Sequence, residues 1–319
     1  MNRRQCVAWL ASTPMAAALP AFGQQDKPIQ IIVPFGPGGS GDISARMLGE
    51  YLTKKTGRTV VVDNKPGANG IIGVEAARIA PADGSVLLLA TTSTHLANPS
   101  LFKKLPYDPG RDFRLVGSFG PGSTYILVRP DAPWTSLPDF VQAAKAAPGK
   151  INFGHFNATS NVTGALFASK AGIQLTPIPY KQVGQAMADL LAGQIQVVFT
   201  DTVAGDSFVA SGQLKALAVH SDARLKRYPN VALVTEVIPD FTIRGGFLGV
   251  AVPAATPLAV QQQLNDWCNE AVTTDPIRSK LESFAFAPAK VSLADLARFE
   301  REERENWKSY VGIAKIEVT

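Results

Sequence analysis

A glycine-rich loop early in the chain carries the residues with the most evident chemistry. The stretch IIVPFGPGGSGD, residues 31–42, fits the pattern G-x-G-x-x-G at Gly36, Gly38 and Gly41. In dinucleotide-binding folds such a loop follows a strand, opens a helix and holds a pyrophosphate. A second apolar run ends in Asp63, 22 residues after Gly41, where a ribose-binding acid would stand. The spacing therefore makes an NAD site one candidate.

The start of the chain argues against a dinucleotide enzyme. Arg3 and Arg4 precede a mostly apolar stretch, and Ala21-Phe22-Gly23 offers the small residues that signal peptidases require. We predict a signal peptide over residues 1–23, cleavage near Gly23 and a periplasmic location. The apolar stretch contains Pro14 and is shorter than the roughly 20 residues of a membrane span. Because an exported protein meets little soluble NAD, an NAD-dependent oxidoreductase stays a remote alternative.

Composition and spacing exclude other classes. Without residues 1–23 the chain keeps 29 basic and 26 acidic residues, without the basic stripe of a nucleic-acid binder. One cysteine, Cys268, remains, so no internal disulfide can form, and the three histidines lack metal-ligand spacing. In GGSGD, Asp42 stands where the serine-hydrolase motif G-x-S-x-G needs glycine. We predict no catalytic residue, metal, cofactor or nucleic-acid partner.

Short apolar runs alternate with amphipathic stretches, which is the pattern of an α/β fold. The first series of strand, helix, strand, helix and strand covers residues 29–33, 42–55, 59–63, 70–80 and 85–90. After residue 120 the alternation resumes, with strands at 124–129, 150–154, 175–179, 195–200 and 214–220 and helices at 137–147, 160–171 and 182–192. Each series predicts a mainly parallel sheet flanked by helices.

The length after residue 23 exceeds a usual single core and predicts two domains. We assign residues 24–122 and 250–319 to the first domain, which holds the glycine loop and the C-terminal helices. Residues 123–249 form the second domain. Two crossing strands, near residues 121–128 and 246–252, join them.

In open α/β sheets, ligands bind beyond the carboxyl ends of strands. The loops expected there are rich in glycine, hydroxyl and amide groups, and Lys181 is their only Lys or Arg: FGPGGSGD (35–42), TTSTHLANP (91–99), HFNATSNVT (155–163), YKQVGQ (180–185) and DTVAGDS (201–207). Backbone N–H groups at helix N-termini favour an anion. The predicted ligand class is a small anion, and a carboxylate fits.

Several blocks between residues 27 and 313 resemble one known family in order and spacing. They are PFGPGGSGDISAR (34–46), DNKPGANGIIGVEAARIAPADG (63–84), NPSLFKKLPYDPGRDF (98–113), PIPYKQVGQAMADLLAGQIQVVF (177–199), SGQLKALAV (211–219) and VPAATP (252–257). The family is the Bug-type periplasmic solute-binding receptors of tripartite tricarboxylate transporters. The resemblance implies a two-domain periplasmic binding protein of type II, a Venus flytrap that is not an enzyme.

The resemblance also implies a ligand and partners. The cleft would capture a di- or tricarboxylate, an acidic amino acid or a related organic acid, and deliver it to a membrane permease of the tripartite tricarboxylate type. We expect a monomer. A receptor that presents its ligand to a membrane signalling partner uses the same flytrap, so this alternative stays open.

The binding residues follow from the family positions that this sequence matches. The first domain would contribute backbone amides from the glycine loop and hydroxyls from a later loop: Phe35, Gly36, Gly38, Gly39, Ser40, Asp42, Thr91, Thr92 and Ser93. The second domain would contribute His155, Asn157, Thr159, Ser160, Tyr180, Gln182 and Asp201. Several of these depart from the family pattern, because His155, Asn157 and Thr159 replace small residues and Gln182 replaces a glycine. Ligand identity therefore stays open.

Several of these residues have a second interpretation. Gly36, Gly38 and Gly39 either bring backbone amides to the ligand or serve only to turn the strand into the helix. Ser40 either contacts the ligand or caps its helix, and Asp42 either reaches the ligand or serves as a first-turn charge. Tyr180 lies either in the core or on the cleft floor, and His155 either faces solvent or the ligand. Asp201 either caps the next turn or accepts an ammonium group from an amino-acid ligand.

Overall fold

Two sheets organise the protein. The computed structural model describes residues 27–241, 243 and 246–318, so the predicted signal peptide lies outside the described residues. Across these residues, no helix combines the length and the apolar character that crossing a membrane requires. The first sheet has the order β2-β1-β3-β11-β4, from the strands Val60–Asn64, Ile29–Val33, Val86–Thr91, Phe247–Pro253 and Phe113–Pro121.

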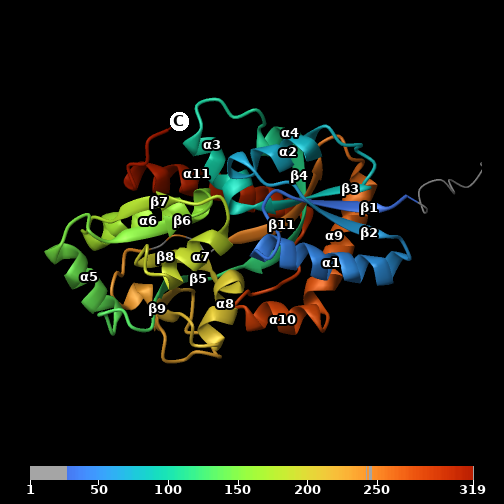
Figure 1. Ribbon diagram of the computed structural model, residues 1–319. Coiled ribbons are helices and arrows are strands. Elements are labelled where there is room, and N and C mark those ends of the chain that lie inside the picture. Colours follow the sequence, from blue (N-terminus) through green and yellow to red (C-terminus); the bar gives the residue numbers. More distant parts are fainter. Residues whose placement is uncertain (1–26, 242, 244–245, 319) are drawn as a thin grey trace, which may run out of the picture.

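The second sheet has the order β10-β9-β5-β8-β6-β7. Its strands are Ala232–Leu233, Lys215–His220, Thr124–Val128, Val197–Asp201, Asn152–His155 and Thr176–Pro179. Figure 1 shows the two sheets in separate lobes that lie side by side, each covered by helices. This arrangement confirms the predicted two-domain α/β fold.

One strand in each sheet runs against its neighbours. β11 pairs antiparallel with β3 and β4, and β5 pairs antiparallel with β8 and β9, whereas the other described pairings are parallel. Both strands border a crossing between the lobes: β5 follows β4 after Gly122 and Ser123, and β11 returns to the first sheet. Residues 247–249, which the sequence analysis assigned to the second domain, pair with the first sheet.

Helices connect the strands within each lobe. Those of the first lobe are α1 (Ser40–Thr56), α2 (Ile71–Arg78), α3 (Asn98–Leu101), α4 (Pro109–Asp112), α9 (Leu258–Thr273) and α10 (Ile277–Ser283), with turns η1 (Ala68–Gly70) and η2 (Thr92–Ala97). Those of the second are α5 (Leu137–Ala146), α6 (Ala158–Ala171), α7 (Val183–Leu191) and α8 (Thr202–Ala210), with turn η3 (Val234–Glu236). The C-terminal helix is α11 (Leu293–Ile313).

The apolar pattern explains why the first elements form. β1 buries both of its faces, as expected of a central parallel strand, and α1 buries Leu48 and Leu52 against the same core. Gly57 ends α1 in the left-handed conformation, with φ of 71°, and its N–H bonds the carbonyl of Thr53. The sequence thus fixes where the glycine loop between β1 and α1 stands.

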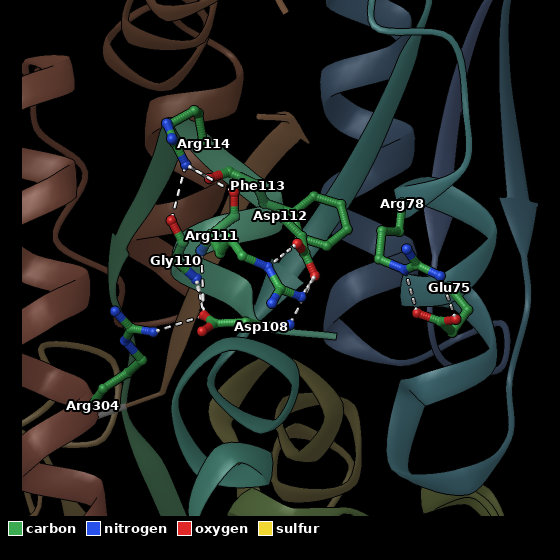
Figure 2. Close-up of polar contacts among 9 residues, drawn as sticks. All are labelled: Glu75, Arg78, Asp108, Gly110, Arg111, Asp112, Phe113, Arg114 and Arg304. Carbon is green, nitrogen blue, oxygen red and sulfur yellow. Dashed lines mark hydrogen bonds and ion pairs between the residues drawn. The ribbon is translucent and has the colours of Figure 1, made fainter. Parts of the chain in front are cut away.

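Helix α11 contacts both lobes. Arg304 pairs with Asp108 of the first lobe at 3.3 Å, next to the Arg111–Asp112 and Arg78–Glu75 ion pairs drawn in Figure 2. Near the end of the helix, the hydroxyl of Ser169 in α6 donates to the carbonyl of Ile313 at 3.3 Å. The C-terminal helix is therefore a further link between the lobes, besides the two crossings.

Cys268 is predicted to resist thiol reagents in the folded protein. Its side chain is 4% exposed within α9, and burial raises the pKa of the thiol to about 12. Because the thiolate is the reactive form, labelling with Ellman's reagent at pH 8 should be negligible until denaturant is added. Rapid labelling of the folded protein would contradict this assignment of Cys268 to the core.

Candidate functional site

A cavity of about 530 Å³ lies between the two lobes, at the ends of strands from both sheets. Fourteen of the sixteen predicted site residues line it: Phe35, Gly36, Gly38, Gly39, Ser40, Asp42, Thr91, Thr92, Ser93, Asn157, Thr159, Ser160, Gln182 and Asp201. Loops that are up to 166 positions apart in the chain thus meet in one space, as expected for carboxyl ends of parallel strands.

Glycine is required at three positions of the first loop for three different geometric reasons. Gly38 has φ of 80°, a left-handed conformation that L side chains rarely adopt. A Cβ atom on Gly41 would stand 2.6 Å from Cδ2 of Leu89, so glycine lets α1 pack closely on β3. A Cβ atom on Gly36 would stand 3.2 Å from Cδ of Gln182, in the opposite lobe. The glycines therefore allow a tight turn, close packing of α1 on β3 and close contact between the loop and Gln182 of the second lobe.

Helix α1 opens into the cavity without a side-chain cap. Its N-cap residue is Gly39, so Ser40 is the first helical residue and not the cap. The N–H groups of the first helical turn have no acceptor within a helix, which leaves those of Ser40 and Gly41 for another acceptor. Together with the helix dipole, these donors favour an anion at this end of the cavity.

Asp42 holds the loop in shape. Its carboxylate accepts from the N–H of Gly38 at 3.0 Å and from Nη2 of Arg46 at 2.8 Å. Burial alone would raise the pKa of Asp42, but the Arg46 and Gly38 hydrogen bonds outweigh it and keep the pKa below its usual range. The N–H of Gly38 therefore already has an acceptor within the loop, and the role of Asp42 is to hold the conformation of the loop.

Replacing this carboxylate by an amide should change how stability depends on pH. A carboxyl group with a lowered pKa in the folded state stabilises the protein above its unfolded pKa of about 4, and this contribution is lost as pH falls through the folded pKa. Asp42→Asn should cost about 1 kcal/mol at pH 7, since solvent screens the half-exposed Arg46. Urea unfolding of both proteins should show this difference shrinking below about pH 4. A pH-independent difference would contradict this role.

The hydroxyl-rich segment after β3 is helical, and the hydroxyls of Thr91 and Thr92 already form hydrogen bonds within the protein. Thr91 is the N-cap of η2, and its hydroxyl accepts from the N–H of Thr94 at 3.2 Å in a capping box. The hydroxyl of Thr92 accepts from the N–H of Phe247 at 2.6 Å. The sequence analysis predicts a loop over residues 91–99, after the strand, and the structure corrects this because Thr92–Ala97 is helical.

In the second lobe, α6 begins at the cavity through a second capping box. Asn157 accepts from the N–H of Ser160 at 2.8 Å, and the Ser160 hydroxyl accepts from the N–H of Asn157 at 3.2 Å. Asp201 is the N-cap of α8, and its Oδ1 accepts from the N–H of Ala204 at 2.9 Å. The polar residues at these strand ends therefore also start the helices.

Direct hydrogen bonds join the lobes across the cavity. The hydroxyl of Ser40 donates to Oδ2 of Asp201 at 3.1 Å. The hydroxyls of Ser93 and Thr159 lie 2.8 Å apart, and the N–H of Thr159 donates to Oγ of Ser93 at 3.2 Å. The described conformation is thus one in which both lobes touch at the site.

Two predicted site residues do not line the cavity. His155, at the end of β6, packs its ring 5.9 Å from that of Phe153, and burial lowers its pKa. Tyr180 lies over Gly154 and donates its hydroxyl to Oδ2 of Asp189 at 2.8 Å. Neither residue is among those that line the cavity, so we leave both out of the proposed site.

The candidate ribose acid has structural partners instead. Asp63 accepts from Nε2 of Gln30 at 2.9 Å and pairs with Lys65 at 3.0 Å. It is not among the residues that line the cavity. The spacing from the glycine loop to Asp63 is therefore no sign of a dinucleotide site in this fold.

Sequence reasoning missed one side of the cavity. Apolar and basic side chains from α7, α8, α10 and the segment after α10 complete the lining, among them Met187, Phe208, Lys280, Phe284 and Phe286. The carbonyl of Phe284 accepts from the hydroxyl of Thr202, and that of Ala285 accepts from Ser123 at 3.1 Å. Helix α10 and the segment after it do not follow a strand. The rule that ligands bind beyond the carboxyl ends of strands therefore gave no signal for Lys280, Phe284 and Phe286.

The described residues contain no group of three or more His, Cys, Asp or Glu side chains that could hold a metal ion. Two lysines, Lys181 and Lys280, line the cavity and are exposed to solvent. Within the described parts of the chain, neither forms an ion pair. The site offers backbone N–H groups, hydroxyls, amides and the positive charges of two exposed lysines, which suits the binding of an anion.

Comparison with known proteins agrees with this geometry. The family model for the tripartite tricarboxylate transporter family receptor, TctC, matches residues 44–316. The protein BugT of Bordetella pertussis is 33% identical over 310 residues, which cover 95% of this chain and 94% of BugT.

Solved structures of similar proteins cover nearly the whole fold. The periplasmic binding protein BugD superposes with a TM-score of 0.84 at 27% identity, covering 91% of this chain and 98% of BugD. R. palustris Rpa4515 with adipate gives 0.87 at 25% identity, covering 91% and 98%. MatC from Rhodopseudomonas palustris with bound malate gives 0.83 at 25% identity, covering 89% and 98%.

These matches confirm the resemblance found in the sequence. The family consists of solute-binding receptors, so the prediction of a receptor and not an enzyme is also confirmed. The chain belongs to the receptor family of the tripartite tricarboxylate transporters, the family of the Bug proteins.

Proposed function

We propose that the protein is a periplasmic receptor that captures a small organic acid between its two lobes. The ligand carboxylate accepts hydrogen bonds from the N–H groups that begin α1. The opposite lobe covers the ligand through the loops that begin α6, α7 and α8. The captured acid is then delivered to a membrane permease of the tripartite tricarboxylate type.

The observation that carries this proposal is the N-terminus of α1. It has no side-chain cap and opens into a cavity of about 530 Å³ between two lobes that touch across it. Fixed backbone donors bind a carboxylate without reorganisation, and each charge-assisted hydrogen bond is worth about 1.5–3 kcal/mol. Few full charges are therefore needed to hold the ligand.

The solved relatives support the ligand class. Rpa4515 is described with adipate and MatC with bound malate, and both share this fold over about nine-tenths of the chain. Membership of the receptor family supports the permease as partner. The N-terminal stretch, with two arginines, an apolar run and small residues up to Gly23, supports export with cleavage near Gly23. We propose a monomer, since one chain supplies both halves of the cavity.

A thermal-shift screen tests the proposal. The protein from residue 24 onward, freed of any ligand carried through purification, is screened against about a hundred small acids, amino acids and nucleotides, NAD among them. A ligand present at 100 times its Kd stabilises the folded state by about 2.7 kcal/mol. For domains of this size that is a rise in Tm of about 5–10 °C.

The expected result is a shift with a restricted set of carboxylates and none with NAD. A shift with NAD and none with acids would overturn the proposal and restore the dinucleotide interpretation of the glycine loop. The absence of any shift with carboxylates at millimolar concentration would likewise count against it.

A further inference from the structure

The carboxylates that line the cavity differ in what neutralises them. Asp42 pairs with Arg46 at 2.8 Å, and Asp206 pairs with Arg227 at 2.6 Å. Asp201 forms no ion pair with any described residue. A site built for an anion thus contains a carboxylate whose charge no described side chain balances.

Asp201 is held in place by neutral donors. Its Oδ1 accepts from the N–H of Ala204 at 2.9 Å, and its Oδ2 accepts from the hydroxyl of Ser40 at 3.1 Å. The backbone N–H groups of Val203 and of Asp201 itself also act on this carboxyl, so all of its donors are uncharged. Burial raises the pKa of this carboxyl, which agrees with a charge that lacks a cationic partner. A positive group on a ligand would supply that partner.

Ser40 places this carboxylate beside the anion-binding end of the cavity. It is the first residue of α1, so its N–H belongs to the turn that we propose for the ligand carboxylate. Its hydroxyl reaches Asp201 in the other lobe. The two features are therefore separated by the reach of one serine side chain. In an α-amino acid, the carboxylate and the ammonium group are attached to the same carbon, which matches this short separation.

We propose that Asp201 selects ligands that carry an ammonium group next to the carboxylate, so that the site takes α-amino acids in preference to plain organic acids of the same length. This inference rests on the proposed function, because it needs the ligand carboxylate at α1. A second carboxylate at the Asp201 position meets a like charge and is disfavoured. The ammonium group instead forms a charge-assisted hydrogen bond with Asp201, in the gap that Ser40 bridges.

The test uses pairs of ligands that differ only in the amino group. They are L-aspartate and succinate, L-glutamate and glutarate, L-alanine and propionate, and L-phenylalanine and 3-phenylpropionate. Titration calorimetry gives the ratio of the two Kd values in each pair for the wild-type mature protein and for Asp201→Asn. The asparagine keeps an oxygen for Ala204 and an NH₂ group that can donate to the Ser40 oxygen, so the fold and the cap of α8 are preserved.

Asp206→Asn is the matched control. It removes the same charge from a residue that lines the same cavity, but Asp206 is directed to Arg227 and to the hydroxyl of Tyr228 at 3.2 Å. A general change in the electrostatic potential of the cavity would alter the ratio of the two Kd values in both variants. A direct contact with the ammonium group would alter it only in Asp201→Asn.

In the pairs that bind, we expect the wild type to hold the amino acid at least tenfold more tightly than its partner. Asp201→Asn should lower this ratio at least tenfold, through weaker binding of the amino acid, and Asp206→Asn should keep it. Equal binding of both members by the wild type, or an unchanged ratio in Asp201→Asn, would overturn the selection while the receptor function stands. Binding of no acid at all, from these pairs or from the larger screen, would overturn both proposals.

Discussion

Gly38→Val is expected to weaken acid binding by about 100-fold or more. Valine is strongly disfavoured at φ of 80°, so the loop has to change its conformation and carry the N–H groups of α1 away from the ligand. Loss of one or two charge-assisted hydrogen bonds, each about 1.5–3 kcal/mol, corresponds to this factor. A Cβ atom at Gly38 has no neighbour within 4 Å, so the effect comes from the backbone and not from a collision. Titration calorimetry with an acid found in the screen gives the affinity.

Gly57→Val provides the control for this experiment. Gly57 lies at the other end of the same helix, has φ of 71° and also has open space around its Cβ position. Both variants should lose about 1–2 kcal/mol of unfolding free energy through similar backbone strain. Only Gly38→Val should lose binding. Normal affinity in Gly38→Val, or an equal loss in both variants, would remove the glycine loop from the site.

Gly36→Val should hold the lobes apart and weaken binding by about 10- to 100-fold, the equivalent of 1.4–2.7 kcal/mol. Gly36 is not among the described glycines with positive φ, so valine causes little strain within the loop itself. Its side chain points at Gln182 in the opposite lobe, whose Cδ would lie 3.2 Å from the new Cβ. Because contact across the cleft completes the site, a variant that cannot close should keep its stability and lose affinity.

Shortening Gln182 should restore the space. Affinity is compared in a cycle of four proteins: the wild type, Gly36→Val, Gln182→Ala and the double variant. If the two side chains collide across the cleft, Gly36→Val should cost much less in the Gln182→Ala background than in the wild type. Additive effects of the two substitutions would contradict the contact between Gly36 and Gln182 in the bound state.

Much of the site could be predicted because it follows the strand ends. The alternation of apolar runs and amphipathic stretches located β1, β3, β6, β7 and β8, and topology brings the residues after them to one place. The loops that contain Asn157, Thr159 and Gln182 were found for this reason, and the resemblance to the family then singled out these residues. The physical role of each could not be predicted, since a side chain such as Asp42 or Ser160 holds its loop through partners that only the fold identifies.

The parts that sequence reasoning missed lack a local signal. β4 was not predicted, and α8 and α10 were treated as loops or left unassigned, although Phe208, Lys280 and Phe284 from these helices line the cavity. Their place depends on contacts between distant segments, such as that of Thr202 with the carbonyl of Phe284. Asp63 shows the opposite case, a local signal without a site, because its spacing fits a ribose acid while its carboxylate binds Gln30 and Lys65.

The central claim is that a ligand carboxylate lies on the N-terminus of α1, between the lobes. A crystal structure of the mature protein with the acid that stabilises it most tests this claim directly. We predict a carboxylate oxygen within about 3 Å of the backbone nitrogen of Ser40 or Gly41, with the ligand also in contact with the second lobe. An acid bound elsewhere, such as in the space at the crossing lined by His220 and Arg224, with α1 free of ligand, would contradict the claim.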